Sequence, residues 1–269
     1  MRKQIVMFAM FAMMAAVSIT GCKKKETVDL TGIHTTEATT TAETMAETKA
    51  PVKVEIKETE AAGSDASAVL SVQAKIATEK NGKTMIEYPI LSNLRNADTE
   101  DSVNTLIKKY ALKLLDVYMI NPEKDNVTIA CDVLSLDRSS GVFAFTGSMM
   151  PEGAAYPTEL YYTLTVDLNK GKIKGLSDYA DPYTMAGYIL SEDCIITKSI
   201  DDSVVKDYLS SLDINVLWET LKNCDFNSQN EDGYPQAFSY ELQGIIYMAI
   251  PVPHALGDYA IVEFHPETK

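Results

Sequence analysis

The sequence predicts an α+β fold in which most strands pair antiparallel. Strand-like runs fall into two groups, before residue 170 and after residue 236, and segments with helical periodicity accompany each group. Because strands and helices do not alternate regularly, parallel βαβ units are not expected. We therefore expect a long helix after the first hairpin, and a second subdomain made of helices and a hairpin.

Four segments are expected along the 269 residues. Residues 1–21 are predicted to be a lipoprotein signal peptide, and residues 22–66 a lipidated cysteine followed by a disordered tether. Residues 67–178 and 179–269 are the two predicted α+β subdomains. Roughly 200 residues are then left for folded structure, which suits one large domain or two small ones.

The N-terminal segment has the order of features found in a secretory signal. Arg2 and Lys3 precede an apolar run from Ile5 to Val17, and small residues lead to Cys22. The run is shorter than the roughly 20 apolar residues that span a bilayer. Residues 19–22 resemble the lipobox of bacterial lipoproteins, whose cysteine receives a diacylglyceryl group and becomes the new N-terminus. The alternatives are a plain secretory signal and an uncleaved anchor.

Lipidation of Cys22 would place the protein outside the cell, anchored to the bacterial cell membrane. Two or more acyl chains, such as palmitate, give stable attachment to the lipid bilayer, whereas one chain is marginal. The Thr- and Glu-rich segment 23–66 has few large apolar side chains, so we expect it to be disordered. A flexible chain of this length spans roughly 35 to 40 Å on average.

The folded region is expected to begin with a hairpin and a helix. Val69–Ile76 and Thr84–Ile90 alternate as strands do, and Asn81-Gly82 between them is a strong hairpin signal. A helix with apolar residues at helical spacing follows, and Asp98 is its expected N-cap. It should end before Asn121-Pro122.

Further strands and two helices are expected downstream. Three or four antiparallel neighbours are predicted from the runs and turns at 126–137, 141–149, 161–168 and 169–172. Two helices are predicted at 202–212 and 215–223, and an acidic loop at 227–233. The last strands are expected at 237–242, 244–249 and 259–264.

The folded region is strongly acidic. From Ala66 onward it contains 16 Lys and Arg against 29 Asp and Glu, which places −13 of the total charge of −14 there. Such a surface repels nucleic acid and anionic wall polymers, and attracts a basic protein or metal ions. The alternative is that the charge serves solubility alone.

The cysteines and histidines give few candidates for chemistry. Cys131 alternates with apolar neighbours and should face the core, whereas Cys194 with Cys224 is the one pair considered for a disulfide. No cysteine or histidine spacing predicts a metal site, so no cofactor is expected. His254 lies in a turn, where it is either a pH-responsive contact residue or merely exposed.

No catalytic residue is predicted, because the sequence contains no nucleophile elbow, phosphate-binding glycine loop or HExxH motif. Four pairs of carboxylates are read as helix caps or solvated loops in preference to Ca²⁺ ligands. They are Asp178 with Asp181, Glu192-Asp193, Asp201-Asp202 and Glu231-Asp232. The pairs Tyr161-Tyr162 and Tyr240 with Tyr247 are read as strand packing in preference to a sugar-stacking platform.

Three phrases occur in a fixed order between residues 68 and 265. They are Tyr88-Pro89-Ile90 with Val103-Asn104, then Tyr156-Pro157-Thr158 through Leu176-Ser177-Asp178, then Ser239-Tyr240 through Tyr247, Pro253, Ala255 and Gly257. This set resembles the extracytoplasmic domain family shared by RsiV-type lysozyme-sensing anti-sigma factors and the N-terminal region of some peptidoglycan deacetylases. The resemblance implies a two-part α+β domain that binds or senses a ligand, which is lysozyme in one branch.

The resemblance also implies a partner-binding loop with Tyr247, Pro253, His254 and Gly257. We therefore expect a non-enzymatic, lipid-anchored binding or sensing protein of the cell envelope, whose ligand is a basic protein such as lysozyme or a cell-wall component. One alternative is an enzyme that modifies a wall polymer with two cleft carboxyls roughly 5 to 9.5 Å apart. The other is a structural partner of an envelope complex.

Overall fold

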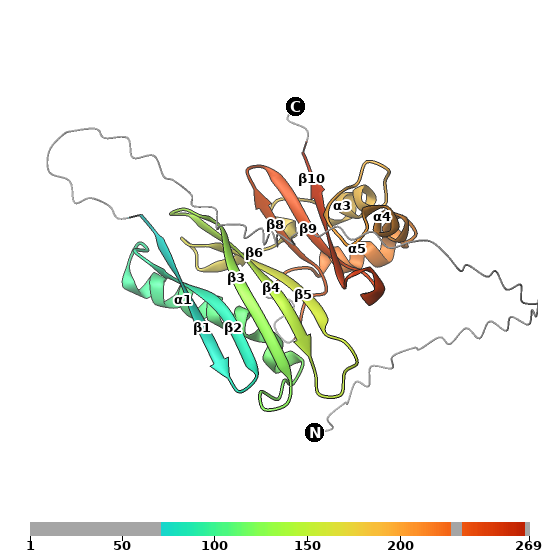
Figure 1. Cartoon of the computed structure of the whole chain (residues 1–269). Coiled ribbons are helices and arrows are strands. Elements are labelled where there is room, and N and C mark those ends of the chain that lie inside the picture. The colour runs from blue at the N-terminus through green and yellow to red at the C-terminus, as the bar shows by residue number, and fades with distance from the viewer. Residues whose placement is uncertain (1–70, 227–232, 267–269) are drawn as a thin grey trace, which may run out of the picture. The chain divides into compact units, whose positions relative to one another are not determined.

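The computed structural model describes residues 71–226 and 233–266, and in that part of the chain it confirms the α+β class. The described residues form two sheets, and the helices lie against them (Figure 1). The predicted signal peptide, Cys22, the whole of the tether and residues 227–232 of the acidic loop lie outside the described residues. Within the described ranges, no helix is both long and apolar enough to span a bilayer.

The first sheet has six strands in the order β1-β2-β3-β4-β5-β6. Their bounds are β1 Gln73–Asn81, β2 Thr84–Ser92, β3 Asn126–Leu136, β4 Ser140–Met150, β5 Thr158–Asp167 and β6 Lys172–Lys174. The predicted antiparallel neighbours from β3 to β6 are confirmed. The pairing of β2 with β3 is parallel, so the expectation that no parallel βαβ unit forms was wrong at this point.

The hairpin of β1 and β2 is confirmed, although its turn is displaced by one residue. Asn81 pairs with Thr84, so the two turn residues are Gly82 and Lys83. Gly82 has φ 53°, and a Cβ there would lie 2.3 Å from the carbonyl oxygen of Pro122. This position therefore needs glycine both for its left-handed backbone and for its close neighbour.

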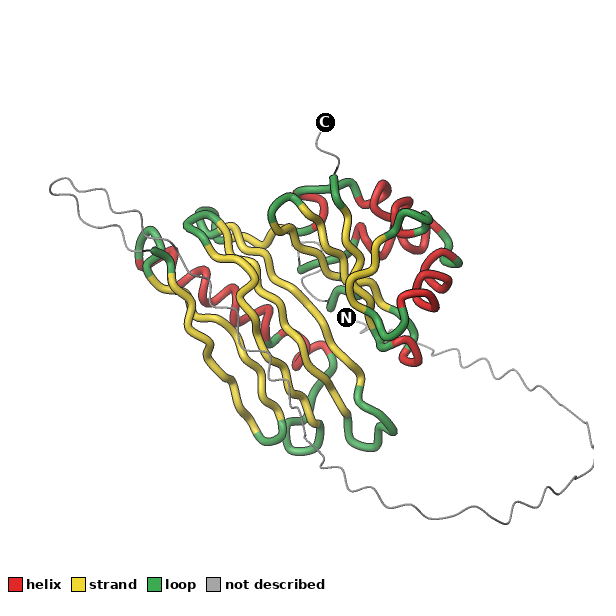
Figure 2. The backbone as a smooth tube through the Cα atoms, turned by 45° about the horizontal axis from the view of Figure 1, so that its top comes forward, coloured by secondary structure: helices red, strands yellow, loops and turns green. Residues whose placement is uncertain are grey.

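Two helices, α1 Ala97–Ala111 and α2 Lys113–Val117, follow the hairpin. Figure 2 shows α1 along one face of the first sheet, which it covers with Val103 and Ile107. The prediction that Asp98 caps this helix was wrong. Asn96 is the N-cap, because its backbone is extended and its side chain accepts a hydrogen bond of 2.8 Å from the Thr99 amide. Asp98 lies in the first turn, where its negative charge interacts favourably with the positive end of the helix dipole.

Asn104 on α1 replaces a missing strand beside β2. The parallel pairing of β2 with β3 ends at Ile86, five residues before Leu91. The Asn104 amide accepts from the Leu91 amide at 2.7 Å and donates to the Leu91 carbonyl at 2.9 Å. One side chain thereby satisfies both backbone groups that would otherwise lack a partner at this point.

Replacing Asn104 with leucine should lower the free energy of unfolding by about 2 kcal/mol, because two partly buried backbone groups lose their partner. Thr105→Ala is the matched control on the same helix, since Thr105 is exposed. Urea denaturation of both variants measures the difference. Equal stability of the two variants would contradict the role assigned to Asn104.

The core of the first sheet is centred on two stacked rings. Phe145 and Tyr162 are parallel to within 1°, with centroids 4.5 Å apart. The Tyr162 hydroxyl donates to the carbonyl of Ala111 at 2.8 Å, which ties the sheet to α1. Because the ring is fully buried, this bond satisfies its polar end.

The second sheet has four strands in the order β7-β10-β9-β8. Its strands are β7 Ile195–Lys198, β8 Phe238–Leu242, β9 Ile245–Pro251 and β10 Tyr259–Phe264. The helices against it are α3 Pro182–Ile189, α4 Asp202–Ser210 and α5 Ile214–Lys222 (Figure 1). The short 3-10 turns η1 Leu176–Asp178 and η2 His254–Leu256 complete the fold. Neither α3 nor β7 was predicted.

Alternating residues of β9 serve two different cores. Ile246, Met248 and Ile250 pack with the helices of the second sheet. Ala249 faces the other way and belongs to the core of the first sheet, together with Phe238 of β8. At this junction Thr163 of β5 donates to the carbonyl of Ser239 at 2.9 Å. The two sheets therefore share buried side chains and a buried hydrogen bond.

A buried carboxylate holds the connection between the sheets. Asp225 follows α5 and accepts hydrogen bonds from the amides of Leu176 at 2.9 Å and Ser239 at 2.6 Å. The Ser239 hydroxyl also donates to it at 2.5 Å, and the Cys224 thiol lies 3.2 Å away. Tyr179 bonds to the same hydroxyl. This network joins the segment after β6 to the exit of α5 and the start of β8.

Candidate binding groove

A cluster of tyrosines lies where the two sheets meet. Tyr161 of β5 and Tyr259 of β10 stack with ring centroids 5.2 Å apart. The Nζ atom of Lys198 on β7 lies 5.7 Å and 5.0 Å from these two centroids, and bonds to the Tyr259 hydroxyl at 2.7 Å. Three strands from two sheets thus build a cation–π contact at the junction.

Beside this cluster the surface is hollowed. A pocket of about 300 Å³ is lined by Thr146, Glu159, Lys198, Ser199, Ile200, Gly257 and Tyr259. A second cavity of about 220 Å³ also has Glu159 and Tyr259 in its lining, together with Asp258. We call the two together the junction groove. Its walls offer aromatic rings and carboxylates, which suit a ligand carrying cationic and apolar groups. They also carry Lys198, whose ammonium group already lies over two of the rings.

The backbone of the junction groove is fixed by a hydrogen bond between the sheets. The Glu159 amide on β5 donates to the Asp258 carboxylate at 2.8 Å. Next to it, Gly257 has φ 97°, and a Cβ there would approach Ile200 to 2.9 Å. Glycine is therefore required where β10 begins, and the loop after β9 is held close to β5.

The structure brings together part of the predicted partner-binding loop. Pro253 precedes η2, and His254 lies in it with its Nδ1 atom 3.0 Å from both Asp258 carboxylate oxygens. The Tyr156 ring, which is 70% exposed, lies 6.0 Å from the imidazole centroid. His254, Gly257 and Asp258 therefore form one continuous edge beside the junction groove.

Tyr247 does not lie in that loop. It is on β9, where it pairs with Glu263 four residues before the strand ends at Pro251. Its ring stacks on Tyr240 with centroids 4.8 Å apart. Tyr240 in turn shares a hydrogen bond with Tyr161, and burial with this neighbour raises the pKa of Tyr161 far above its usual value. Tyr240 and Tyr247 therefore pack against each other, which confirms the prediction for this pair.

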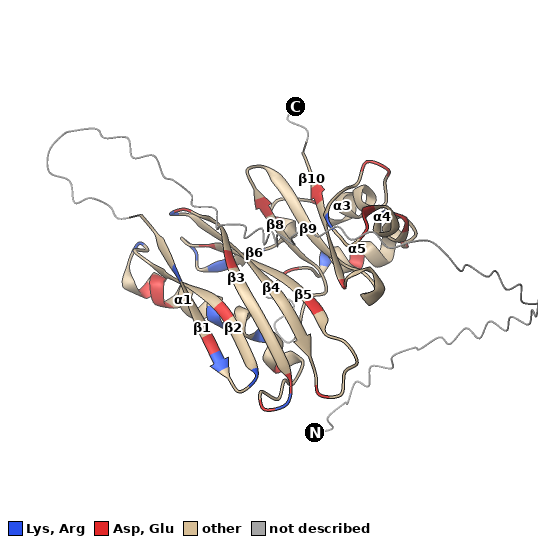
Figure 3. Ribbon diagram, viewed as in Figure 1, with Lys and Arg blue, Asp and Glu red and all other residues tan. Residues whose placement is uncertain are grey.

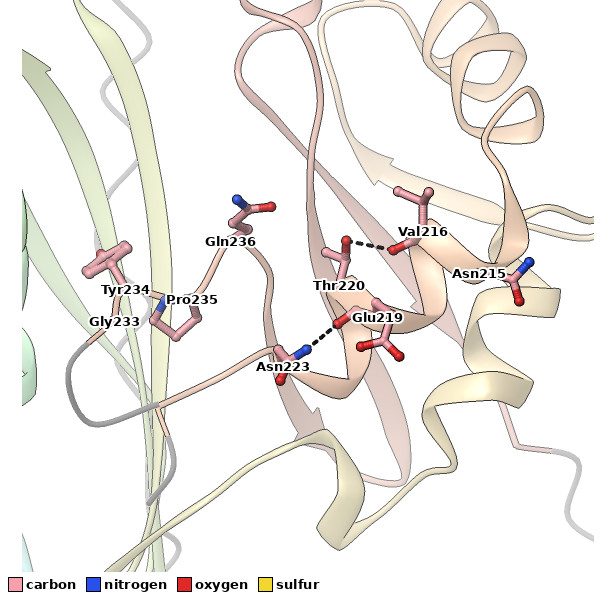
Figure 4. Close-up of a pocket in the computed structure, with 9 residues that line it drawn as sticks. All are labelled: Asn215, Val216, Glu219, Thr220, Asn223, Gly233, Tyr234, Pro235 and Gln236. Atoms are coloured by element: carbon pink, nitrogen blue, oxygen red, sulfur yellow. Dashed lines mark hydrogen bonds between the residues drawn. The ribbon is translucent and has the colours of Figure 1, made fainter. Parts of the chain in front are cut away.

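Another hollow of about 630 Å³ runs along α5 (Figure 4). Its polar side chains already bond to their own helix, because Thr220 donates to the Val216 carbonyl at 2.9 Å and Asn223 to the Glu219 carbonyl at 2.8 Å. We therefore place the candidate site at the junction groove.

The carboxylate pairs that can be described act as caps or lie in exposed turns, as predicted, and Glu192-Asp193 is exposed in a turn. Asp181 accepts from the Thr184 amide at 2.8 Å, and Asp201 accepts from the Ser203 amide at 3.0 Å. Asp178 accepts from the Gly175 amide at 2.8 Å. Acidic residues gather around α4 in Figure 3. Within the described ranges, no group of three or more His, Cys, Asp or Glu could hold a metal ion.

The structure does not join Cys194 to Cys224, the pair considered for a disulfide. Both residues are buried thiols, as is Cys131. Cys224 directs its sulfur at the Asp225 carboxylate, so the residue serves the buried network instead. Cys131 faces the core as predicted, and burial raises the pKa of its thiol to about 12. Such a thiol is unreactive at neutral pH.

Several residues of the junction groove were not singled out from the sequence. Lys198 and Glu159 are single charged residues in short strand patterns, and nothing in their spacing relates them to Tyr259. Asp258 carried a weak signal, because an Asp after a glycine often occupies a turn with positive φ. It has φ 67° in the structure.

Comparison with known proteins gives a distant structural likeness. No family model and no curated protein matches the chain. A crystal structure of a DUF3298 family protein from Pseudomonas aeruginosa PAO1 is 9% identical, with 66% of this chain and 81% of that chain covered and a TM-score of 0.34. A DUF3298 member from Bacteroides fragilis NCTC 9343 is 13% identical, with 72% and 89% covered and a TM-score of 0.35.

Proposed function

We propose that this protein is a lipid-anchored, extracytoplasmic binding or sensing protein of the bacterial cell envelope. In this proposal Cys22 carries the lipid, residues 23–66 form the tether, and the junction groove binds the ligand. The sequence Ile19-Thr20-Gly21-Cys22 after a short apolar run supports the anchor. The finer assignment to RsiV-type domains belongs to the same proposal and rests on the phrases of the sequence.

The residues that line the junction groove are the basis for the ligand that we propose. Tyr161 and Tyr259 already hold the ammonium group of Lys198 against their rings. The carboxylates of Glu159 and Asp258 line the same groove, within a folded region whose net charge is −13. Because Lys198 already covers these rings, the carboxylates and the net charge are what favour a basic protein, whose lysine or arginine side chains would pair with the carboxylates, and lysozyme is our leading candidate.

Replacing Glu159 with glutamine should weaken lysozyme binding about fivefold, because one exposed charge pair is lost while the shape of the side chain is kept. The measurement is a titration of the detergent-solubilised full-length protein with lysozyme. Asp207→Asn is the matched control, because it removes one exposed charge from α4, away from the groove.

Two results would count against this assignment. An equal loss of affinity in both variants would mean that the protein attracts the ligand through its net charge and does not bind it in the groove. Binding weaker than about millimolar in the unmodified protein would remove lysozyme as the ligand.

A further inference from the structure

The strand β1 is an open edge of the first sheet. It is the outermost strand in the sheet order, and Figure 2 shows it at that position. Its nine residues pair with β2 without a bulge, from Gln73 opposite Ser92 to Asn81 opposite Thr84. Within the described part of the chain, no strand pairs with its outer side. An edge of this kind is a template for pairing with another strand.

The turn of the hairpin determines which backbone groups point outward. A two-residue turn closes with a hydrogen-bonded pair, so Asn81 and Thr84 exchange hydrogen bonds. Hydrogen-bonded and non-hydrogen-bonded pairs alternate along antiparallel strands. The amides and carbonyls of Ala74, Ile76, Thr78 and Lys80 therefore point away from β2. A second strand must bring its own outward residues opposite these four.

We propose that β1 pairs antiparallel with β1 of a second copy of this chain, in a register centred on Ala77. A symmetric dimer uses the same patch on both subunits, so each residue faces its mirror position about the centre. Centring on Ala77 overlaps all nine residues and places outward residues opposite outward residues. Ile76 then faces Thr78 and Ala74 faces Lys80, with both pairs repeated by the two-fold axis.

Charge complementarity selects this register. Lys75 of each copy faces Glu79 of the other, so two opposite-charge pairs form at non-hydrogen-bonded positions, where side chains approach most closely. A centre at Ile76 or Thr78 loses both pairs, and a centre at Glu79 sets two glutamates against each other. Lysine on an edge strand ordinarily prevents pairing. Here Lys75 gains a partner of opposite charge only in the register centred on Ala77.

On the face of the sheet that α1 covers, side chains beside β1 are placed so that they could support this contact. Lys108 of α1 holds the Glu79 carboxylate at 2.9 Å, while 42% of the Glu79 side chain is exposed. Ile90, the register partner of Lys75 on β2, is 43% exposed on the same face. It lines a hollow of about 770 Å³ between β2 and α1 with Tyr88 and Leu112. A second β1 strand would cover part of this apolar surface.

Cysteine cross-linking of the full-length protein in membranes tests the register. Ala77→Cys should form a disulfide-linked dimer on mild oxidation, because residues at a non-hydrogen-bonded centre lie about 4.5 Å apart between Cα atoms, which a disulfide can span. Thr78→Cys is the matched control. It would face Ile76 of the partner and lie about 8 Å from its own counterpart, beyond disulfide reach.

Charge reversal tests the ion pairs in the Ala77→Cys background. Lys75→Glu should lower the cross-linked fraction about tenfold, and adding Glu79→Lys should restore it, because the two charges are then exchanged. Lys80→Glu is the control with the same change of charge, since Lys80 faces Ala74, and it should retain the dimer.

Three outcomes would overturn the proposal. The first is an Ala77→Cys dimer no more abundant than that of Thr78→Cys. The second is a dimer that is unaffected by Lys75→Glu. The third is an undimerised chain whose β1 amides are protected from hydrogen exchange, which would assign the edge to a segment of the same chain before residue 71.

Discussion

Replacing Asp225 with alanine is expected to lower the free energy of unfolding by about 4 kcal/mol. The carboxylate accepts from the Leu176 amide, the Ser239 amide and the Ser239 hydroxyl, and all three donors are buried. Leaving each of them without a partner costs about 1 to 3 kcal/mol, and removing the buried charge offsets part of this loss. Denaturant unfolding of the folded region measures the effect.

Asp225→Asn is the control that separates hydrogen bonding from backbone strain. Asp225 has φ 63°, a conformation that asparagine tolerates better than alanine. Asparagine keeps one acceptor oxygen but turns an amino group toward donors, so we expect a loss of about 2 kcal/mol. Full stability of the alanine variant would mean that the network does not hold the connection between the sheets.

The same carboxylate makes stability depend on pH. Burial raises the pKa of Asp225 from 3.8 to about 6, against the opposing effect of its hydrogen bonds with Ser239. The folded state therefore binds this proton more tightly than the unfolded state. Its contribution is present in full below about pH 4 and is lost as the pH rises through about 6.

Between pH 4 and pH 7, Asp225 should thus remove about 2 kcal/mol from the free energy of unfolding. Other carboxyls act in the opposite direction. Hydrogen bonds from Thr184, for example, lower the pKa of Asp181. The measurement is therefore the difference between the unmodified protein and Asp225→Asn at the two pH values. A difference that does not change with pH would contradict the assignment.

Replacing Cys22 with serine is expected to abolish lipidation. A serine hydroxyl cannot take the thioether-linked lipid, so a palmitate analogue supplied to growing cells should label the unmodified protein and leave the variant unlabelled. Cys194→Ala is the control, because it removes a buried thiol that is not at the lipobox. Label retained in Cys22→Ser would place the lipid on another residue, and an unlabelled parent protein would contradict the anchor.

The local patterns of the sequence predicted the hairpins because such pairings depend on neighbouring residues. Gly82 and the pair Gln243-Gly244 have the positive φ that two-residue turns need, and both turns join strands close to the expected positions. The parallel pairing of β2 with β3 could not be predicted from local patterns, since two helices separate these strands in the chain. Beyond the end of this pairing, the side chain of Asn104 on a helix makes the hydrogen bonds to β2 that a neighbouring strand would otherwise make.

The missed elements are short and show no clear periodicity in the sequence. The helix α3 begins at Pro182 and has eight residues that are mostly apolar, so no polar stripe reveals its period. The strand β7 has four residues, too few for an alternation to be recognised. The long helix α1 was predicted because its apolar residues occupy one face, and only its cap was misplaced.

The candidate site could be predicted only in pieces. The sequence marked His254 and Gly257 through the family resemblance and Tyr161 through strand alternation. It did not show that Tyr161 of the first sheet would meet Tyr259 and Lys198 of the second. Such a site is made by tertiary packing between distant strands, for which sequence periodicity carries no signal.

The central claim is that a lipid-anchored acidic domain binds a basic protein through its junction groove. The most direct test is the affinity of the detergent-solubilised full-length protein for lysozyme at two salt concentrations. We predict binding that weakens roughly tenfold between about 50 mM and about 300 mM salt, because screening acts on long-range attraction between opposite charges. Affinity that is unchanged by salt, or no binding at the lower concentration, would contradict the claim.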